Sequence, residues 1–193
     1  VLAYCGDGYD GYIATFTISS DGTSITRVTY LEHDMYIGKS NSLVQVDSDT
    51  YALAYRGRGD DGFIKTFTVP ADGSSIDQVQ SLEHNTNYAD YNSLIQVDSD
   101  TYLLAYGNVA EVSTFTISSD GSSISERATL SHLSGNGAYH NTWAKVDSDT
   151  YVLAYQDPSN GDDGYVKTFT INNSSGAITQ VAVNEVDPYY YYG

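Results

Sequence analysis

The sequence has little that would crosslink the chain or draw it to a polyanion. Among 193 residues there is one cysteine, and Lys and Arg together number eight. Because Cys5 has no second cysteine to pair with, an intramolecular disulfide framework is excluded. The formal net charge of −17 argues against binding to nucleic acid, because nucleic acids attract basic surfaces. Cations are the small partners that this charge favours.

Long apolar runs are also missing. No stretch approaches the ~18 consecutive apolar residues of a membrane span, so we expect no membrane insertion. The chain starts at Val1 without a basic and then apolar leader, which predicts a mature or trimmed product. Tyr (19) and Gly (17) are abundant, a composition typical of secreted, strand-rich proteins. We therefore expect a secreted, extracellular or cell-surface location.

One module recurs along the whole chain. Leu-Ala-Tyr stands at residues 2–4, 53–55, 104–106 and 153–155, and Thr-Phe-Thr at 15–17, 66–68, 114–116 and 168–170. A step of about fifty residues is the length of a four-stranded propeller blade. We predict a single domain of four repeats, with approximate bounds 1–39, 40–90, 91–140 and 141–193.

Each repeat predicts four strands, A to D. In the second repeat these are residues 41–46, 51–55, 63–69 and 76–84, and Asp72-Gly73 predicts a hairpin turn between the last two. No helical period is visible. Since the strands carry apolar side chains on both faces, each sheet must be covered on both sides, which stacked repeats achieve. The predicted fold class is all-β and β-propeller-like.

The first repeat lacks strand A, because Val1 corresponds to Ala52. Three explanations stay open: a longer array, a short first blade, or a strand donated by a neighbouring molecule. An unpaired strand edge templates pairing with another chain, which favours self-assembly into filaments. The predicted assembly residues are Val1, Leu2, Ala3, Tyr189, Tyr190, Tyr191 and Tyr192. The alternative for the tyrosine run is a linker.

The repeat resembles the tandem propeller-type modules of bacterial secreted and surface proteins. The residues that carry the resemblance are Leu-Val-Gln-Val-Asp-Ser-Asp-Thr-Tyr, Leu-Ala-Tyr, Thr-Phe-Thr-Ile and Ser-Asp-Gly-Ser-Ser-Ile. It covers nearly the whole chain and implies a fold and a cell-surface context. It implies no activity, because such modules are generic scaffolds.

Paired carboxylates recur on the turns between strands A and B. Oxygen ligands two residues apart are common in calcium sites, although a full site needs six to eight oxygens. The alternative is that each Asp caps its own turn by bonding to backbone amides. The predicted calcium ligands are Asp47, Asp49, Asp98, Asp100, Asp147 and Asp149. We expect no other cofactor.

Three histidines, His33, His84 and His132, occupy the same repeat position at the end of strand D. Converging imidazoles would bind Zn²⁺, but a propeller separates equivalent positions by wide angles. The sequence therefore favours polar residues at the blade edge.

Aromatic residues in polar loops are typical of glycan-binding surfaces, because aromatic faces stack on sugar rings. The candidates are Tyr88, Tyr91, Tyr139 and Trp143, with a core position as the alternative for Trp143.

Catalytic motifs are not found, and the four arginines do not occupy equivalent repeat positions. We therefore predict a non-enzymatic structural or adhesive repeat protein that partners with itself, as a homopolymer or a longer array. A lectin-like propeller is the alternative, and a glycoside hydrolase the third choice.

Overall fold

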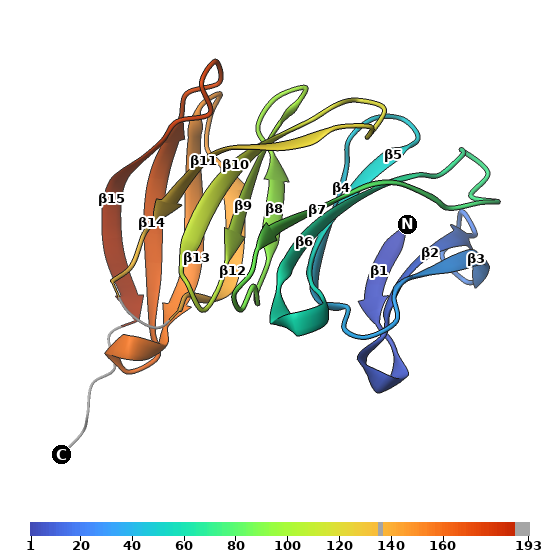
Figure 1. Ribbon diagram of the computed structural model, residues 1–193, viewed down its shortest axis with the longest axis horizontal. Coiled ribbons are helices and arrows are strands. Elements are labelled where there is room, and N and C mark those ends of the chain that lie inside the picture. The colour runs from blue at the N-terminus through green and yellow to red at the C-terminus, as the bar shows by residue number, and fades with distance from the viewer. Residues whose placement is uncertain (135–136, 188–193) are drawn as a thin grey trace.

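The computed structural model describes residues 1–134 and 137–187, which form four antiparallel sheets in sequence order. Figure 1 shows the sheets in a row, from the blue N-terminal sheet to the red C-terminal one. The all-β, propeller-like prediction is confirmed, including the short first repeat, because the first sheet has three strands and the others have four. Among the described residues, no helix is long and apolar enough to cross a membrane.

The strand bounds follow the repeat. Sheet I contains β1 (Leu2–Cys5), β2 (Gly11–Ile18) and β3 (Ile25–Asp34), and sheet II contains β4 (Lys39–Gln45), β5 (Thr50–Arg56), β6 (Gly62–Thr68) and β7 (Asp77–Asn85). Sheet III contains β8 (Ser93–Gln96), β9 (Thr101–Tyr106), β10 (Glu111–Ile117) and β11 (Ile124–Ser131). Sheet IV contains β12 (Tyr139–Lys145), β13 (Thr150–Asp157), β14 (Asp163–Ile171) and β15 (Ile178–Asp187).

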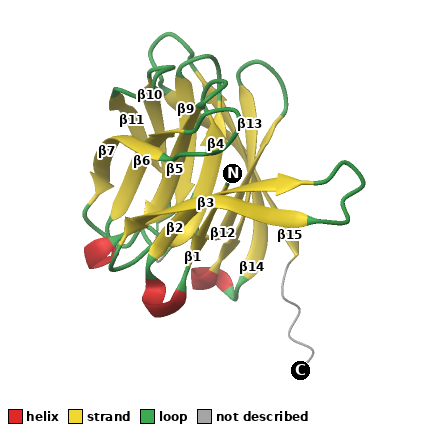
Figure 2. Cartoon of the chain, turned by 90° about the vertical axis from the view of Figure 1, so that its right-hand side faces the viewer, coloured by secondary structure: helices red, strands yellow, loops and turns green. Residues whose placement is uncertain are grey.

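Three short 3₁₀ helices, which the sequence did not predict, lie in the loops between strands B and C. They are η1 (Asp7–Tyr9), η2 (Arg58–Asp60) and η3 (Pro158–Asn160). Each has only three residues, and η1 and η2 contain a glycine with positive φ, so no helical period marks them. Figure 2 shows all three at the same end of the molecule, which we call the rim.

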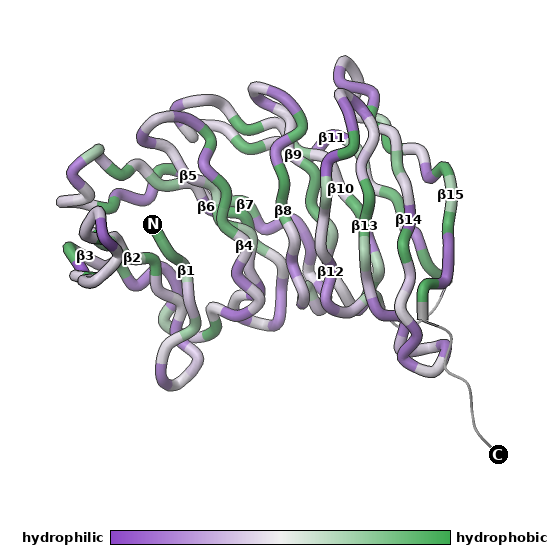
Figure 3. The backbone as a smooth tube through the Cα atoms, turned by 180° about the vertical axis from the view of Figure 1, so that it is seen from behind, coloured by the Kyte–Doolittle hydropathy of each residue, from purple (hydrophilic) through white to green (hydrophobic). Residues whose placement is uncertain are grey.

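The sheets stack face to face, and we distinguish two faces of each sheet. The leading face points to the preceding sheet and carries residues such as Phe67 and Val69 of sheet II. The trailing face points to the following sheet and carries Ala52, Ala54 and Ile64 in the same sheet. Small residues on one face meet large residues on the next, as Ala52 and Ala54 meet Tyr102 and Leu104, so the side chains of neighbouring sheets interdigitate. In Figure 3 the hydrophilic colour is concentrated in loops and the hydrophobic colour along strands.

A repeated clasp joins each sheet to the next. A β-bulge interrupts the pairing of strands C and D between Thr15 and Phe16, and again at Thr66/Phe67. The Thr66 hydroxyl accepts from the backbone N–H of Gln80 at 3.1 Å and donates to the carbonyl of Gly121, in the C–D turn of sheet III, at 2.7 Å. Thr15 bonds to Gly73 and Thr114 to Gly176 in the same way, both at 2.7 Å.

Candidate functional site

The rim carries ion pairs that centre on one arginine. Both ion pairs found between described residues involve Arg56, at the end of β5. Its Nη1 contacts the carboxylate of Asp90 from the loop before β8, and its Nε lies 3.3 Å from Oδ1 of Asp60 in η2. The Ser40 hydroxyl donates to the other oxygen of Asp90 at 2.7 Å. The loops of two adjacent sheets therefore converge on one guanidinium.

The two carboxylates around Arg56 are not equivalent. Asp90 is the more buried and has both oxygens engaged, one by Arg56 and one by Ser40. Asp60 is more exposed and contacts Arg56 through one oxygen. Asp90 therefore holds the guanidinium in place, whereas Asp60 keeps an oxygen for another group.

Tyrosines surround this group. The Arg56 guanidinium lies over the ring of Tyr88 at 5.0 Å, and Tyr91, next to Asp90, lies 4.8 Å from the ring of Tyr139. Burial, with the nearby charge of Asp90 and the ring of Tyr139, raises the pKa of Tyr91 above its usual value. Three of the four predicted glycan-binding residues thus lie at the rim around the Arg56 group.

The fourth predicted glycan residue lies elsewhere. Trp143 is 8% exposed and contacts the ring of Phe169 edge-on at 5.5 Å, inside the core between sheets III and IV. It occupies the position of Leu43 and Leu94 in the repeat, so its size is used in packing. Trp143 is therefore not available to a ligand at the surface.

The predicted calcium ligands lie at the opposite end of the strands from the rim. The Asp147 carboxylate accepts backbone N–H bonds from Asp149 and Thr150, and these bonds lower the pKa of Asp147. Asp98 accepts the equivalent bonds from Asp100 and Thr101. No group of three or more His, Cys, Asp or Glu suited to a metal ion occurs within 1–134 and 137–187. A calcium site at these turns stays a prediction.

The three repeated histidines lie between sheets rather than exposed at a blade edge; His33 and His132 are buried, and His84 is partly buried. His33, His84 and His132 each contact, edge-on, a Tyr and a Phe on the leading face of the next sheet. Burial lowers the pKa of His33 and His84 to about 4 and that of His132 to about 3, and the charges of Lys65 and Lys167 add to the effect at His33 and His132. The sequence did not predict this position between sheets. The histidines recur once per repeat in strand D, but that recurrence does not show which face of the strand the next sheet covers.

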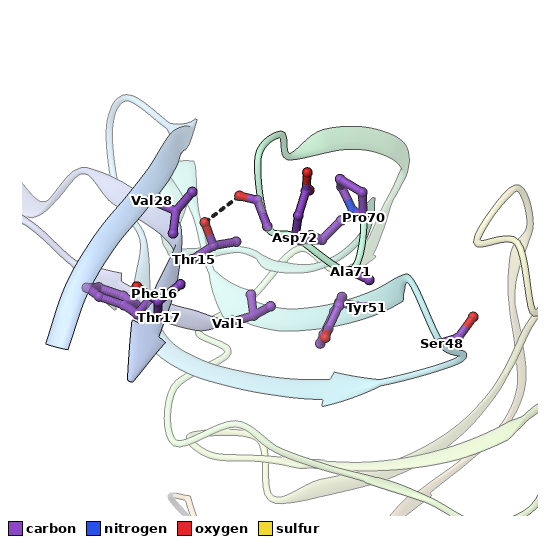
Figure 4. Close-up of a pocket in the computed structure, with 12 residues that line it drawn as sticks. Val1, Thr15, Phe16, Thr17, Val28, Ser48, Tyr51, Pro70, Ala71 and Asp72 are labelled. Atoms are coloured by element: carbon purple, nitrogen blue, oxygen red, sulfur yellow. Dashed lines mark hydrogen bonds between the residues drawn. The ribbon is translucent and has the colours of Figure 1, made fainter. Parts of the chain in front are cut away.

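A cavity of about 370 Å³ lies between sheets I and II, away from the rim. Figure 4 shows Val1, Thr15 and Tyr51 around it, with the Thr15 hydroxyl bonded to the carbonyl of Gly73. Tyr51 is partly buried here, whereas the equivalent Tyr151 is fully buried. The hydroxyl of Tyr151 donates to the carbonyl of Val97, the residue that follows β8 of sheet III. The cavity thus lies beside the three-stranded sheet, and its lining includes the carboxylate of Asp72.

The predicted assembly residues are divided between the two ends of the chain. Val1 and Leu2 are exposed and Ala3 is partly buried. Tyr189, Tyr190, Tyr191 and Tyr192 lie outside the described residues. Cys5 is an exposed free thiol.

Comparison with known proteins identifies the fold. No model of a protein family matches the sequence, and no curated protein is similar to it. A solved structure from Lactobacillus plantarum is similar over 96% of this chain and 52% of its own, with a TM-score of 0.71 and 16% identity. A protein named as a candidate 6-phosphogluconolactonase from Bacteroides fragilis matches over 95% of this chain and 56% of its own, with a TM-score of 0.67 and 14% identity.

The NanB sialidase from Streptococcus pneumoniae matches over 92% of this chain and 29% of its own, with a TM-score of 0.64 and 13% identity. The chain spans about half the length of the first two structures. At these identities the likeness shows a propeller-type fold.

The prediction of a non-enzymatic structural or adhesive repeat protein is wrong, because solved structures with this fold include proteins named as a lactonase and a sialidase. The error has a physical cause. Repeated apolar positions encode the stacking of sheets, whereas Arg56 and Asp90 stand where the other repeats have different residues. The sequence signal that could have indicated Arg56 and Asp90 is that each departs from the residues at the equivalent positions of the other repeats.

Proposed function

We propose that the chain is part of a propeller hydrolase whose substrate is a hydroxyl-rich sugar derivative, most simply a sugar lactone. The observation that carries the proposal is the Arg56 guanidinium fixed between Asp60 and Asp90 at the rim. The names of the Bacteroides fragilis and Streptococcus pneumoniae proteins support a sugar-derived substrate.

The residues have distinct roles in this proposal. Asp60, the more exposed carboxylate, takes a proton from a water molecule that attacks the lactone carbonyl. Arg56 donates to the oxyanion that develops on that carbonyl, while Asp90 and Ser40 hold Arg56 in position. The ring C–O bond then breaks, and the proton passes to the leaving oxygen. Tyr88 and Tyr139 offer aromatic faces for the sugar ring.

The test is hydrolysis of gluconolactone and 6-phosphogluconolactone, followed by acid release in a pH-stat and corrected for the buffer rate. We expect wild-type turnover above the buffer rate, and Asp60→Asn to lower kcat by about 10²–10⁴-fold. Arg58→Gln is the matched control, since Arg58 lies in the same loop but contacts the ring of Tyr36. Wild-type protein that does not exceed the buffer rate on either lactone overturns the proposal.

We also propose a location outside the cytoplasm, as in the bacterial secreted proteins that the repeat resembles. The scarcity of Lys and Arg and the abundance of Tyr support this location. Fractionation of the native cells with an antibody against the chain tests it, and protein found only in the cytoplasm contradicts it.

A further inference from the structure

The outer faces of the two end sheets carry residues at repeat positions that are buried in the internal interfaces. On the leading face of sheet I, Ile18 is 65% exposed and Ile25 is 68% exposed. Their counterparts in sheet II, Val69 and Ile76, are 4% and 9% exposed because sheet I covers them. Together with Val1, Leu2 and Phe16, Ile18 and Ile25 line a largely apolar groove of about 300 Å³.

The trailing face of sheet IV shows the complementary half of the same interface. The small Ala154 is exposed there, whereas the equivalent Ala54 and Ala105 have no exposed surface. Val166 and Thr168 are partly exposed, although their counterparts in sheets I to III are buried.

Both halves of a fourth clasp are also present and unused. The C–D turn of sheet I contains Gly22, which has no neighbouring atom within 4 Å of an added Cβ, whereas Gly73, Gly121 and Gly176 contact a Thr of the preceding sheet. Thr168 of sheet IV stands in the place of those threonines. The Gly22 turn and the Thr168 hydroxyl that would donate to its carbonyl therefore lie in the first and last sheets of one chain.

Sheet IV differs from the other sheets at two positions of its outer strand, β15. Val186 stands at the position of the three histidines that lie between sheets and is exposed, so a covering sheet would bury an apolar residue there. Asn184 stands where the other trailing faces have Leu31, Leu82 and Leu130, and it adds a polar position to this face. Interfaces between chains commonly have an apolar centre and a polar margin.

We propose that the leading face of sheet I stacks on the trailing face of sheet IV of a second copy of the chain, and that two copies close into a ring of eight sheets. The three internal interfaces show what covers each face, namely the other face of the same repeat. Eight sheets lie within the range of four to eight blades found in propellers. The contact is sheet against sheet, with the clasp of Gly22 on Thr168, and not the strand-edge pairing expected from the sequence.

The mass of the 193-residue chain in solution tests the proposal. We expect light scattering after size-exclusion chromatography, at about 0.15 M salt and micromolar protein, to give twice the 21.0 kDa of one chain. A single-chain mass at every concentration overturns the proposal, as does a mass that keeps growing beyond two copies. Native material whose intact mass accommodates further repeats overturns the choice of a second copy.

A substitution can strengthen the same contact. In sheet III, Arg127 donates to the carbonyls of Asn173 and Ser174 in the turn of sheet IV. Val181 is the equivalent residue of sheet IV and is exposed. Val181→Arg therefore offers the same donors to the Ser19–Ser24 turn of the second copy, and we expect the dimer dissociation constant to fall about tenfold.

Val79→Arg is the matched control, because it adds the same charge at the equivalent position of sheet II, where the neighbouring C–D turn is that of sheet III in the same chain. We expect it to change the dissociation constant less than twofold. Equal effects of Val181→Arg and Val79→Arg contradict the proposed contact. In the opposite direction, Ile25→Asp should give monomers while Met35→Asp, also at an exposed apolar residue of the first repeat, should not. Retention of the dimer by Ile25→Asp contradicts the proposal.

Discussion

The two ends of the strands in this protein follow different rules. At one end, the A–B turns repeat Val-Asp-Ser-Asp-Thr and the C–D turns dock on a Thr of the preceding sheet in all three internal interfaces. At the rim, the B–C loops differ, with η1, η2 and η3 in three repeats and a short turn at residues 107–110 in the third. The repeated end encodes stacking, whereas the variable rim leaves room for a group such as Arg56 with its two carboxylates.

Strain does not distinguish the rim group from its surroundings. Asp60 has a φ of 69°, and the equivalent Tyr9 and Asp162 have φ values of 77° and 67°. Ser40, Tyr91 and His140 likewise share positive φ values at one repeat position. Because the left-handed conformation recurs in every such loop, it belongs to the scaffold, and only the side chains are particular to Arg56 and its partners.

The largest expected effect tests the stacking itself. Phe115 has no exposed surface and lies between sheets II and III, so Phe115→Ala should lower the free energy of unfolding by about 3–5 kcal/mol. Phe16→Ala, at the equivalent position of the uncovered leading face, should have a clearly smaller effect in the monomer. Denaturant titration of both variants measures the difference, and equal losses would contradict the distinction between inner and end sheets.

The second effect concerns the histidines at the rim end of the interfaces. His84 has its pKa lowered by burial to about 4, so between pH 6.5 and 4 the unfolded state binds more protons than the folded state. Stability contributed by neutral His84 is therefore complete above pH 6.5 and is lost as the pH falls toward 4. We expect His84→Leu to reduce the loss of unfolding free energy between pH 7 and 4.5 by roughly 2–3 kcal/mol. Identical pH slopes for variant and wild type in urea titrations would show that the imidazole is not held neutral.

The clasp gives a smaller effect. Thr66→Val removes the donor to the carbonyl of Gly121 and leaves buried polar groups unpaired, which should lower the unfolding free energy by about 1–2 kcal/mol. Thr168→Val, on the uncovered face of sheet IV, is the control and should change monomer stability by less than about 0.5 kcal/mol. Chemical denaturation at dilute protein concentration measures both, and a neutral Thr66→Val would mean that the turn is held by other contacts.

The smallest effect concerns the repeated Asp turns. With a net charge of −17, the fold should gain stability from screening, and NaCl and CaCl₂ at matched ionic strength should raise the Tm by a similar few degrees. A scanning thermal melt compares the two salts. A much larger rise with CaCl₂ would instead support calcium at Asp98, Asp147 and their partners.

The sequence predicted the parts of the fold that depend on periodic apolar residues. Strand C of the second repeat, expected at residues 63–69, is β6 (Gly62–Thr68), and the short first sheet follows from the alignment of Val1 with Ala52. Three of the predicted glycan residues, Tyr88, Tyr91 and Tyr139, do lie at one end of the molecule, but the sequence could not place Arg56 among them. That contact joins β5 to the loop before β8, 34 residues further along, and depends on how loops of adjacent sheets cross. The alternation of apolar residues within one repeat does not show how the loops of adjacent sheets meet.

The two partners of each clasp are synthesised at different times, because the threonine always precedes the turn in the sequence. The hydroxyl of each clasp is made 55 to 62 residues before the turn that receives it. At roughly 5–20 residues per second, a newly made sheet waits about 3–12 s before its trailing face is covered. Throughout that interval the nascent chain exposes an apolar trailing face. Because the repeats are similar, a repeat of another chain could pack on this face in place of the next repeat of the same chain. Slower translation between repeats would therefore lengthen the exposure and favour misassembly rather than prevent it.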